Sequence, residues 1–126
     1  MEKQEIKEGF LSWLDSSLEQ EFPTEMAAVN FNLYDDGDDQ WSSELVGTSS
    51  FDENDDDWAC DEVYSNRDHL YVFDCAMEWE DVLNLICDSV KEYLENGRHA
   101  DTLKGLQGVG VGFVDGDITV VCKRGC

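Results

Sequence analysis

The chain has 126 residues, 41% of them hydrophobic, and thirty acidic residues against eight Lys and Arg give it a formal net charge of -22. This length suits a single domain spanning residues 1–126, and its hydrophobic content is too high for the disorder that often accompanies strong charge. Like-charge repulsion argues against direct binding to nucleic acid or to an anionic membrane surface, whereas basic proteins and cations are favoured partners.

Targeting signals and cysteine usage both point to the cytoplasm. No apolar run approaches the roughly 20 residues that span a bilayer, and the opening MEKQEIKEGF lacks the apolar region of a signal peptide. The five cysteines form no C-x-x-C pair and leave one over in any disulfide scheme, which fits a reducing compartment. Cys60, Cys75 and Cys87 stand beside apolar residues, so we expect small buried side chains and no zinc site.

The first predicted elements are a helix and a strand. Ile6, Phe10, Leu14 and Leu18 recur at four-residue spacing and predict a helix over residues 2–20. Proline disfavours the helical conformation of the residue before it, so Phe22-Pro23 follows the helix end. Apolar and polar residues then alternate over residues 26–34, as in a strand with one buried face.

A second strand is predicted over residues 41–51, after the acidic run DDGDD at 35–39, where Asp-Gly favours a hairpin turn. The polar residues 52–57 predict a loop. Two more strands are predicted over residues 58–64 and 69–75, and one strand bent or broken at 65–68 would give the same pattern.

The second helix is predicted from apolar residues that fall on one stripe: Trp79, Val82, Leu83, Ile86, Val90, Tyr93 and Leu94. Gly97 follows the last of them, so we expect this helix to end near residue 96. Residues 109–114 and 118–122 flank Asp115-Gly116-Asp117 and predict a hairpin. Together these elements predict an α+β fold, a two-layer sandwich in which a mainly antiparallel sheet of about five to six strands carries two helices on one face.

Three chemical motifs are weaker than they first look. The GVGVG run at residues 108–112 resembles a phosphate loop, but no helix follows it, so a closely packed strand is the better interpretation. The acidic loop at 52–57 lacks the glycine and the final glutamate of an EF-hand. Histidines, cysteines and carboxylates without diagnostic spacing do not define a catalytic set. We therefore expect no enzyme, no cofactor and no dedicated metal site.

The charge distribution is the strongest functional signal. Between Glu8 and Asn66 there are seventeen Asp and Glu residues and no Lys or Arg. Aromatic residues interleaved with carboxylates suit a surface that recognises basic proteins. The predicted partner-binding residues are Asp35, Asp36, Asp38, Asp39, Trp41, Asp52, Glu53, Asp55, Asp56, Asp57, Trp58, Asp61 and Glu62.

These residues fall into two acidic loops, residues 35–39 and 52–57, at opposite ends of a strand of eleven residues. A straight strand of that length separates them by roughly 35 Å. One loop would then bind a partner while the other is solvated, and we favour the side at residues 58–62.

In size, acidity, α+β pattern and its GFVDGDITVV hairpin, the chain resembles the small cytoplasmic immunity proteins of bacterial polymorphic-toxin systems. The resemblance implies a protein that binds and blocks a cognate toxin domain, such as a basic nuclease. One alternative is a nucleic-acid mimic or regulatory protein that binds a DNA- or RNA-binding protein. Another is a divalent-metal-binding protein, or a small metal-dependent enzyme, that uses the Asp-rich loops.

Overall fold

A computed structural model describes residues 2–123 of the chain. In chain order the elements are α1 (Lys3–Ser17), β1 (Ala28–Gly37), β2 (Gln40–Thr48), the 3-10 helix η1 (Asp56–Cys60), β3 (Glu62–Ser65), β4 (Tyr71–Asp74), α2 (Trp79–Asn96), α3 (Ala100–Lys104), β5 (Gly108–Phe113) and β6 (Thr119–Lys123). Within these residues no helix has both the length and the apolar character that a membrane crossing requires.

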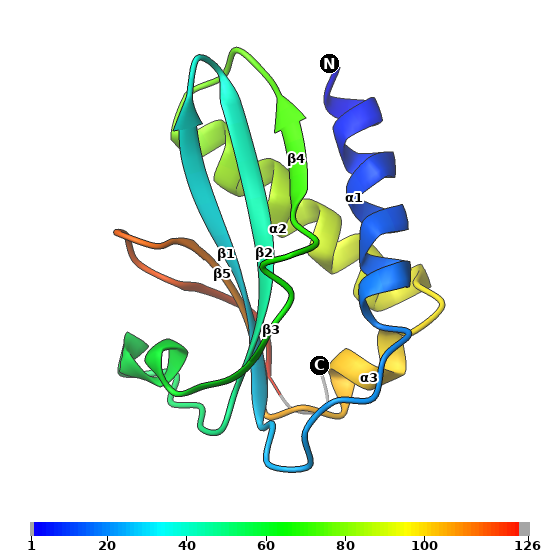
Figure 1. Ribbon diagram of the computed structural model, residues 1–126, viewed down its shortest axis with the longest axis vertical. Helices are drawn as coiled ribbons and strands as arrows, with labels where there is room; N and C mark the ends of the chain where they lie inside the picture. Colours follow the sequence, from blue (N-terminus) through cyan, green and yellow to red (C-terminus); the bar gives the residue numbers. More distant parts are fainter. Residues whose placement is uncertain (1, 124–126) are drawn as a thin grey trace.

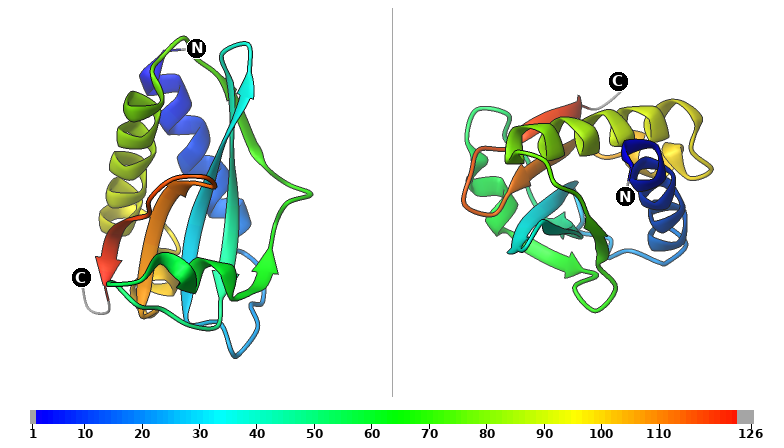
Figure 2. Two further views of the ribbon diagram at one scale, coloured as in Figure 1. Left: turned by 90° about the vertical axis from the view of Figure 1, so that its left-hand side faces the viewer. Right: turned by 90° about the horizontal axis from the view of Figure 1, so that it is seen from above.

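The six strands form one sheet in the order β3-β2-β1-β5-β6, and β4 continues the β3 edge along β2. All neighbouring strands are antiparallel except β1 and β5, which run parallel in the centre. Helices α1 and α2 cover one face of the sheet, while η1 lies against the other (Figures 1 and 2). The predicted α+β sandwich, with its mainly antiparallel sheet and two helices on one face, is confirmed.

The hydrophobic core lies between this sheet and the two long helices. Phe10 and Leu14 of α1, Val82 and Ile86 of α2, and Phe31 of β1 are each fully buried. The rings of Phe10 and Phe31 meet edge to face, with centroids 5.8 Å apart. The four-residue and two-residue spacings of the sequence therefore identified the buried faces of both helices and of β1.

The first hairpin differs in detail from its prediction. Strand β1 continues through the expected loop to Gly37, and β2 begins at Gln40, so the turn consists of Asp38 and Asp39 alone. Both turn residues have positive φ, 52° and 62°, and Gly37 has φ 84°. Aspartate tolerates this left-handed region better than most residues, and a two-residue turn with positive φ follows the twist of the paired strands.

Between residues 58 and 75 the sequence allowed either two strands or one bent strand, and the structure has two, β3 and β4, separated by a turn. Asn66 lies between them and takes the place of a strand partner for β2: its side-chain Oδ1 accepts from the Leu45 backbone N–H at 2.8 Å, and its backbone N–H donates to the Leu45 carbonyl at 3.2 Å. The strand predicted over residues 58–64 is wrong in its first half, because residues 56–60 form η1. The short helix α3 was also missed.

The glycines of β5 allow close packing on the face opposite the helices. A Cβ at Gly108 would lie 2.2 Å from the ring of Phe51, and one at Gly110 would lie 2.7 Å from the Ile118 side chain and 3.2 Å from the Trp58 ring. The rings of Phe51 and Trp58 pack against each other, with centroids 5.0 Å apart. The interpretation of GVGVG as a closely packed strand is confirmed.

Candidate functional site

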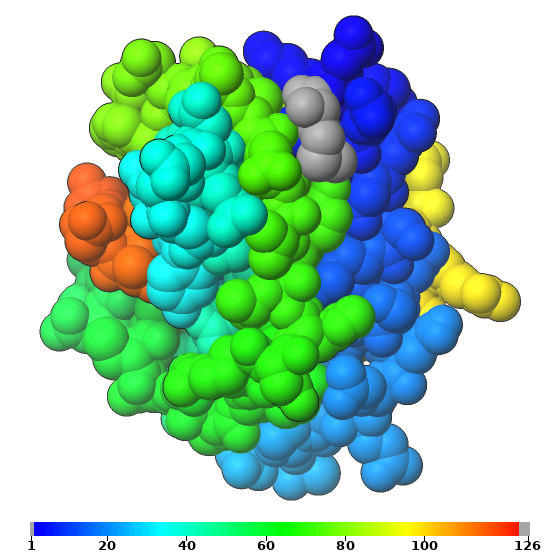
Figure 3. Space-filling view, turned by 45° about the horizontal axis from the view of Figure 1, so that its top comes forward, coloured from blue at the N-terminus to red at the C-terminus, as the bar shows by residue number. Residues whose placement is uncertain are grey.

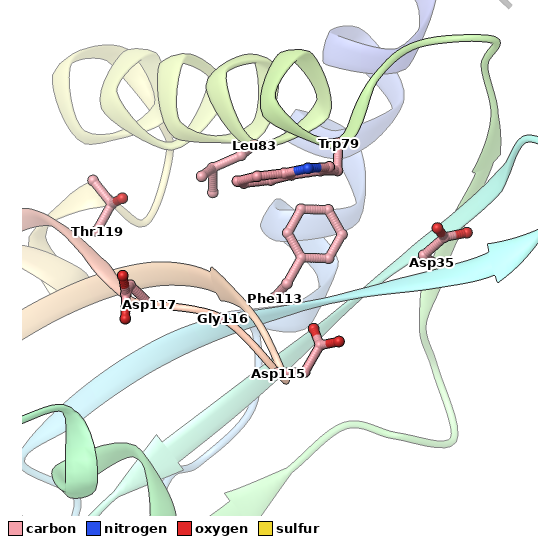
Figure 4. Close-up of a pocket in the computed structure, with 8 residues that line it drawn as sticks. All are labelled: Asp35, Trp79, Leu83, Phe113, Asp115, Gly116, Asp117 and Thr119. Atoms are coloured by element: carbon pink, nitrogen blue, oxygen red, sulfur yellow. The ribbon is translucent and has the colours of Figure 1, made fainter.

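A pocket of about 650 Å³ lies where the beginning of α2 faces the β5–β6 turn and the end of β1. Figure 4 shows the residues that line it converging from these three segments, and in the space-filling view the same segments adjoin one another (Figures 3 and 4). The lining consists of Asp35, Trp79, Leu83, Phe113, Asp115, Gly116, Asp117 and Thr119. We call this the acidic pocket.

Aromatic rings form one side of the acidic pocket. Trp79, the first residue of α2, leaves 53% of its surface exposed and meets Phe113 edge to face, with centroids 6.1 Å apart. On its other side Phe113 packs against Trp41 at 5.9 Å. Trp41 is only 5% exposed, and its indole N–H donates to the carbonyl of Cys75 at 2.9 Å. Trp41 is thus a buried side chain that packs behind Phe113, while Trp79 presents its ring to solvent.

The parallel pairing of β1 with β5 places Asp35 and the β5–β6 turn on the same pocket. Leu33 is the register partner of Phe113, so Asp35 and Asp115 each follow a paired position by two residues. Asp117 is carried by the same β5–β6 turn, and all three side chains are exposed. The described residues that line the pocket include no basic side chain. Asp35 accepts a hydrogen bond from the Gly37 backbone amide at 3.0 Å, and none of the three carboxylates forms an ion pair among the described residues. The pocket therefore combines an exposed indole with three negative charges that no described basic side chain neutralises.

More carboxylates surround this pocket at the same end of the sheet. The Asp39 carbonyl accepts a hydrogen bond from the Cys75 amide at 2.8 Å, and Asp74 is the register partner of Gln40, so the end of β4 is held against the hairpin tip. We call the exposed residues Asp35, Asp36, Asp38, Asp39, Asp74, Asp115 and Asp117 the acidic end. Ion pairs among the described residues use other carboxylates, those of Glu44, Glu53, Glu62 and Glu92.

The second predicted loop lies at the opposite end of the β1–β2 hairpin from its tip and close to the β5–β6 turn (Figure 1), and most of its carboxylates have internal partners. Asp56 accepts from the backbone amide of Ile118 at 3.1 Å. Asp52 and Asp55 each accept from the backbone N–H two residues later, and Asp61 accepts from the Ser50 hydroxyl. Glu53 and Glu62 form ion pairs, with Lys123 and Arg67 respectively. Most carboxylates of the region that the sequence analysis favoured as the binding surface therefore hold η1 and its neighbours in place.

Two predicted partner contacts are buried. Trp41 is 5% and Trp58 is 3% exposed, so both belong to the interior and neither presents its ring at the surface. Cys60 is exposed, contrary to the expectation that it is buried; Cys75 is half-buried and Cys87 is buried as expected. One acidic residue outside the predicted set, Glu44 of β2, is buried, with 1% of its surface exposed.

Glu44 lies at the centre of a hydrogen-bonded cluster that the sequence analysis missed. The hydroxyls of Tyr34 and Ser65 both donate to its carboxylate, and Arg67 Nε donates at 3.0 Å. Burial alone would raise the pKa of Glu44, but these hydrogen bonds and the charge of Arg67 outweigh it and lower the pKa. This cluster joins β1, β2 and β3, and we assign it a structural role.

Sequence reasoning also missed the pocket residues Trp79, Phe113, Asp115 and Asp117. The apolar stripe of α2 predicts a buried Trp79, but as the first residue of the helix it is half exposed. Asp115 and Asp117 were read only as turn residues. Their proximity to Asp35 depends on strand order, which spacing within each strand does not reveal.

The described residues contain no group of three or more His, Cys, Asp or Glu side chains arranged to hold a metal ion. Comparisons with protein-family models, curated protein sequences and solved structures find no match to this chain. The acidic pocket and the acidic end therefore have to be interpreted from their own chemistry.

Proposed function

We propose that this protein binds a basic protein and neutralises it by occupying the surface with which that partner binds a polyanion. The favoured biological setting is toxin immunity, with the partner a cognate toxin domain such as a nuclease. The acidic end carries the proposal: seven exposed carboxylates gather there, none of them in an ion pair among residues 2–123, on a chain of net charge -22.

The physical argument concerns both the rate and the selectivity of association. A protein that binds nucleic acid carries a basic cleft, and a compact acidic surface is steered toward that cleft by long-range attraction. The cost of gathering these charges is self-repulsion within the folded protein, which the partner's Lys and Arg residues would relieve. Trp79 adds the exposed aromatic residue that protein interfaces favour near their centre.

The test begins with affinity capture from the native cell and continues with the purified partner. We expect a basic protein that is toxic when produced alone, and whose toxicity is suppressed when this chain is produced with it. A basic DNA- or RNA-binding partner without toxicity would support nucleic-acid mimicry instead. A partner without a basic surface would overturn the proposal in both forms.

A pair of matched variants then tests the acidic end. Asp36→Asn with Asp38→Asn and Asp39→Asn removes three charges there, while Glu19→Gln with Asp88→Asn and Glu95→Gln removes three from exposed helical positions or helix ends. We expect the first set to slow association with the captured partner by about tenfold at low salt and to flatten its salt dependence. Equal effects of the two sets would remove the acidic end from the interface.

A further inference from the structure

We infer that the acidic pocket receives a single arginine side chain of the partner, with the guanidinium against the exposed indole of Trp79 and its N–H groups directed at one or two of the carboxylates of Asp35, Asp115 and Asp117, which lie on different sides of the pocket. This inference rests on the proposed function, because the arginine comes from the basic protein. It adds a defined anchor to an interface otherwise described only by charge.

The shape and charge of the pocket favour a cationic occupant with a flat, partly apolar surface. Its volume of about 650 Å³ falls within the range of specific ligand sites. The rings of Trp79 and Phe113 are perpendicular, with an interplanar angle of 90°, so they form a corner instead of a closed stack. The carboxylates come from the end of β1 and from the β5–β6 turn, and in Figure 4 Asp35 and Asp117 lie on opposite sides of this aromatic corner, with Asp115 between them.

Arginine fits this arrangement better than lysine does. Its guanidinium is planar and weakly hydrated, so it packs against an aromatic ring while its edge donates to carboxylates. A carboxylate can accept two parallel N–H bonds from it, which the lysine ammonium cannot supply in that geometry. The exposed ring of Trp79 and three carboxylates in one pocket offer both kinds of contact together.

Two other occupants fit less well. A divalent ion requires several oxygen ligands converging on one point, and the described carboxylates do not form such a group. An apolar side chain would cover the rings but leave three carboxylates partly desolvated. The positive end of α2 points toward the pocket and disfavours a cation, but Glu80 and Asp81 in its first turn oppose that field.

Hexa-arginine and hexa-lysine peptides provide the test, because they carry the same charge and differ in the cationic group. The chain has four tryptophans, of which Trp13, Trp41 and Trp58 are at most 7% exposed. The indole N–H resonance of Trp79 in a nitrogen-proton correlation spectrum therefore reports on the pocket. We expect hexa-arginine to shift this resonance most and to bind about three- to fivefold more tightly than hexa-lysine at low salt.

Variants separate the pocket from general charge. We expect Asp35→Asn with Asp115→Asn and Asp117→Asn to weaken hexa-arginine binding by about tenfold, and the matched set at Asp36, Asp38 and Asp39 to weaken it less than about threefold. Trp79→Leu, followed by calorimetry, should remove the preference for arginine, while Trp79→Phe retains part of it. Circular dichroism of each variant verifies that it is folded.

Equal affinities for the two peptides, or equal losses in the two aspartate sets, would overturn the inference. A Trp79 resonance that calcium shifts at lower concentration than hexa-arginine does would replace it with a metal site. If the pocket fails these tests while a basic partner is still captured, the proposed function stands without this anchor. If the peptides bind as expected but no basic partner exists, the proposed function fails and the arginine pocket remains.

Discussion

Glu44 and Arg67 form an ion pair across the edge of the sheet in which the carboxylate is buried and the guanidinium is exposed. Arg67 Nε lies 3.0 Å from Glu44 Oε2, and the side chains are 65% and 1% exposed, respectively. A second guanidinium nitrogen lies 2.6 Å from Glu62. The hydroxyls of Tyr34 and Ser65 also donate to Glu44, so the buried carboxylate accepts three hydrogen bonds that offset the cost of removing its charge from water.

We predict that Glu44→Gln lowers the free energy of unfolding by about 1–3 kcal/mol at neutral pH, because the amide replaces an acceptor of three donors with a group that also donates. The pKa of Glu44 is lowered in the folded protein, so its stabilising effect is present above its ordinary pKa of 4.5 and is lost as pH falls through the lowered value. The difference between wild type and variant should therefore shrink as the pH falls below 4.5, as urea denaturation at neutral and at acidic pH would measure.

Glu53→Gln serves as the control, since its carboxylate pairs with Lys123 at an exposed position. Such pairs contribute little, so we expect a change below about 0.5 kcal/mol at either pH. A Glu44→Gln variant as stable as wild type at neutral pH would contradict the structural role of the hydrogen-bonded cluster around Glu44.

Close packing around Gly110 gives a second prediction. An added methyl group there would meet Ile118 at 2.7 Å, Asn30 Oδ1 at 2.8 Å and Trp58 at 3.2 Å. We expect Gly110→Ala to destabilise the protein by about 1–3 kcal/mol. Gly116→Ala is the matched control, because its nearest contact would be an ordinary 3.7 Å. Thermal unfolding of both variants measures the difference, and similar melting temperatures would argue against the packing of η1 on β5.

The acidic end should also destabilise the free protein. We expect Asp36→Asn with Asp38→Asn and Asp39→Asn to raise the free energy of unfolding by about 0.5–1 kcal/mol at low ionic strength, because three repelling charges are removed. Added sodium chloride should stabilise the wild type more than the variant. Asparagine also suits the positive φ of the turn, and any gain that persists at high salt measures that separate effect.

The cysteines should differ in reactivity according to burial. Burial raises the pKa of the Cys87 thiol to about 11, against a lowering by Lys91 and a further rise from Asp88. Cys60 is exposed and free. We therefore expect iodoacetamide to modify Cys60 first and to spare Cys87 until the protein unfolds, as peptide mass mapping at mildly alkaline pH would show. Modification of Cys87 at the rate of Cys60 would contradict its burial.

Spacing in the sequence was sufficient for most of the fold. The four-residue repeat of Ile6, Phe10 and Leu14 identified α1, and the alternation around Phe31 identified β1, because each pattern reports which side of an element is buried. The same reasoning failed over residues 58–60, where Trp58 is buried from a 3-10 helix. A buried tryptophan in a short apolar run does not distinguish strand from helix.

The candidate site was predicted only in part. The hairpin tip and Asp35 were named from charge alone, but their relation to Asp115, Asp117 and Trp79 follows from the parallel register of β1 and β5. The sequence also does not show which carboxylates have internal partners. Those at residues 52–62 looked as available as the tip, yet most of them bind neighbouring backbone or basic groups.

The central pairing of β1 with β5 has a consequence for folding kinetics. Ala28 pairs with Gly108, a residue eighty positions later in the chain, whereas β1 and β2 are neighbours through a two-residue turn. Contacts between such distant residues slow folding, because a long loop must close before they stabilise anything. During synthesis the β1–β2 hairpin can form early, but one edge of β1 stays open until β5 has left the ribosome. The protein's most aggregation-prone moment therefore falls late in its synthesis.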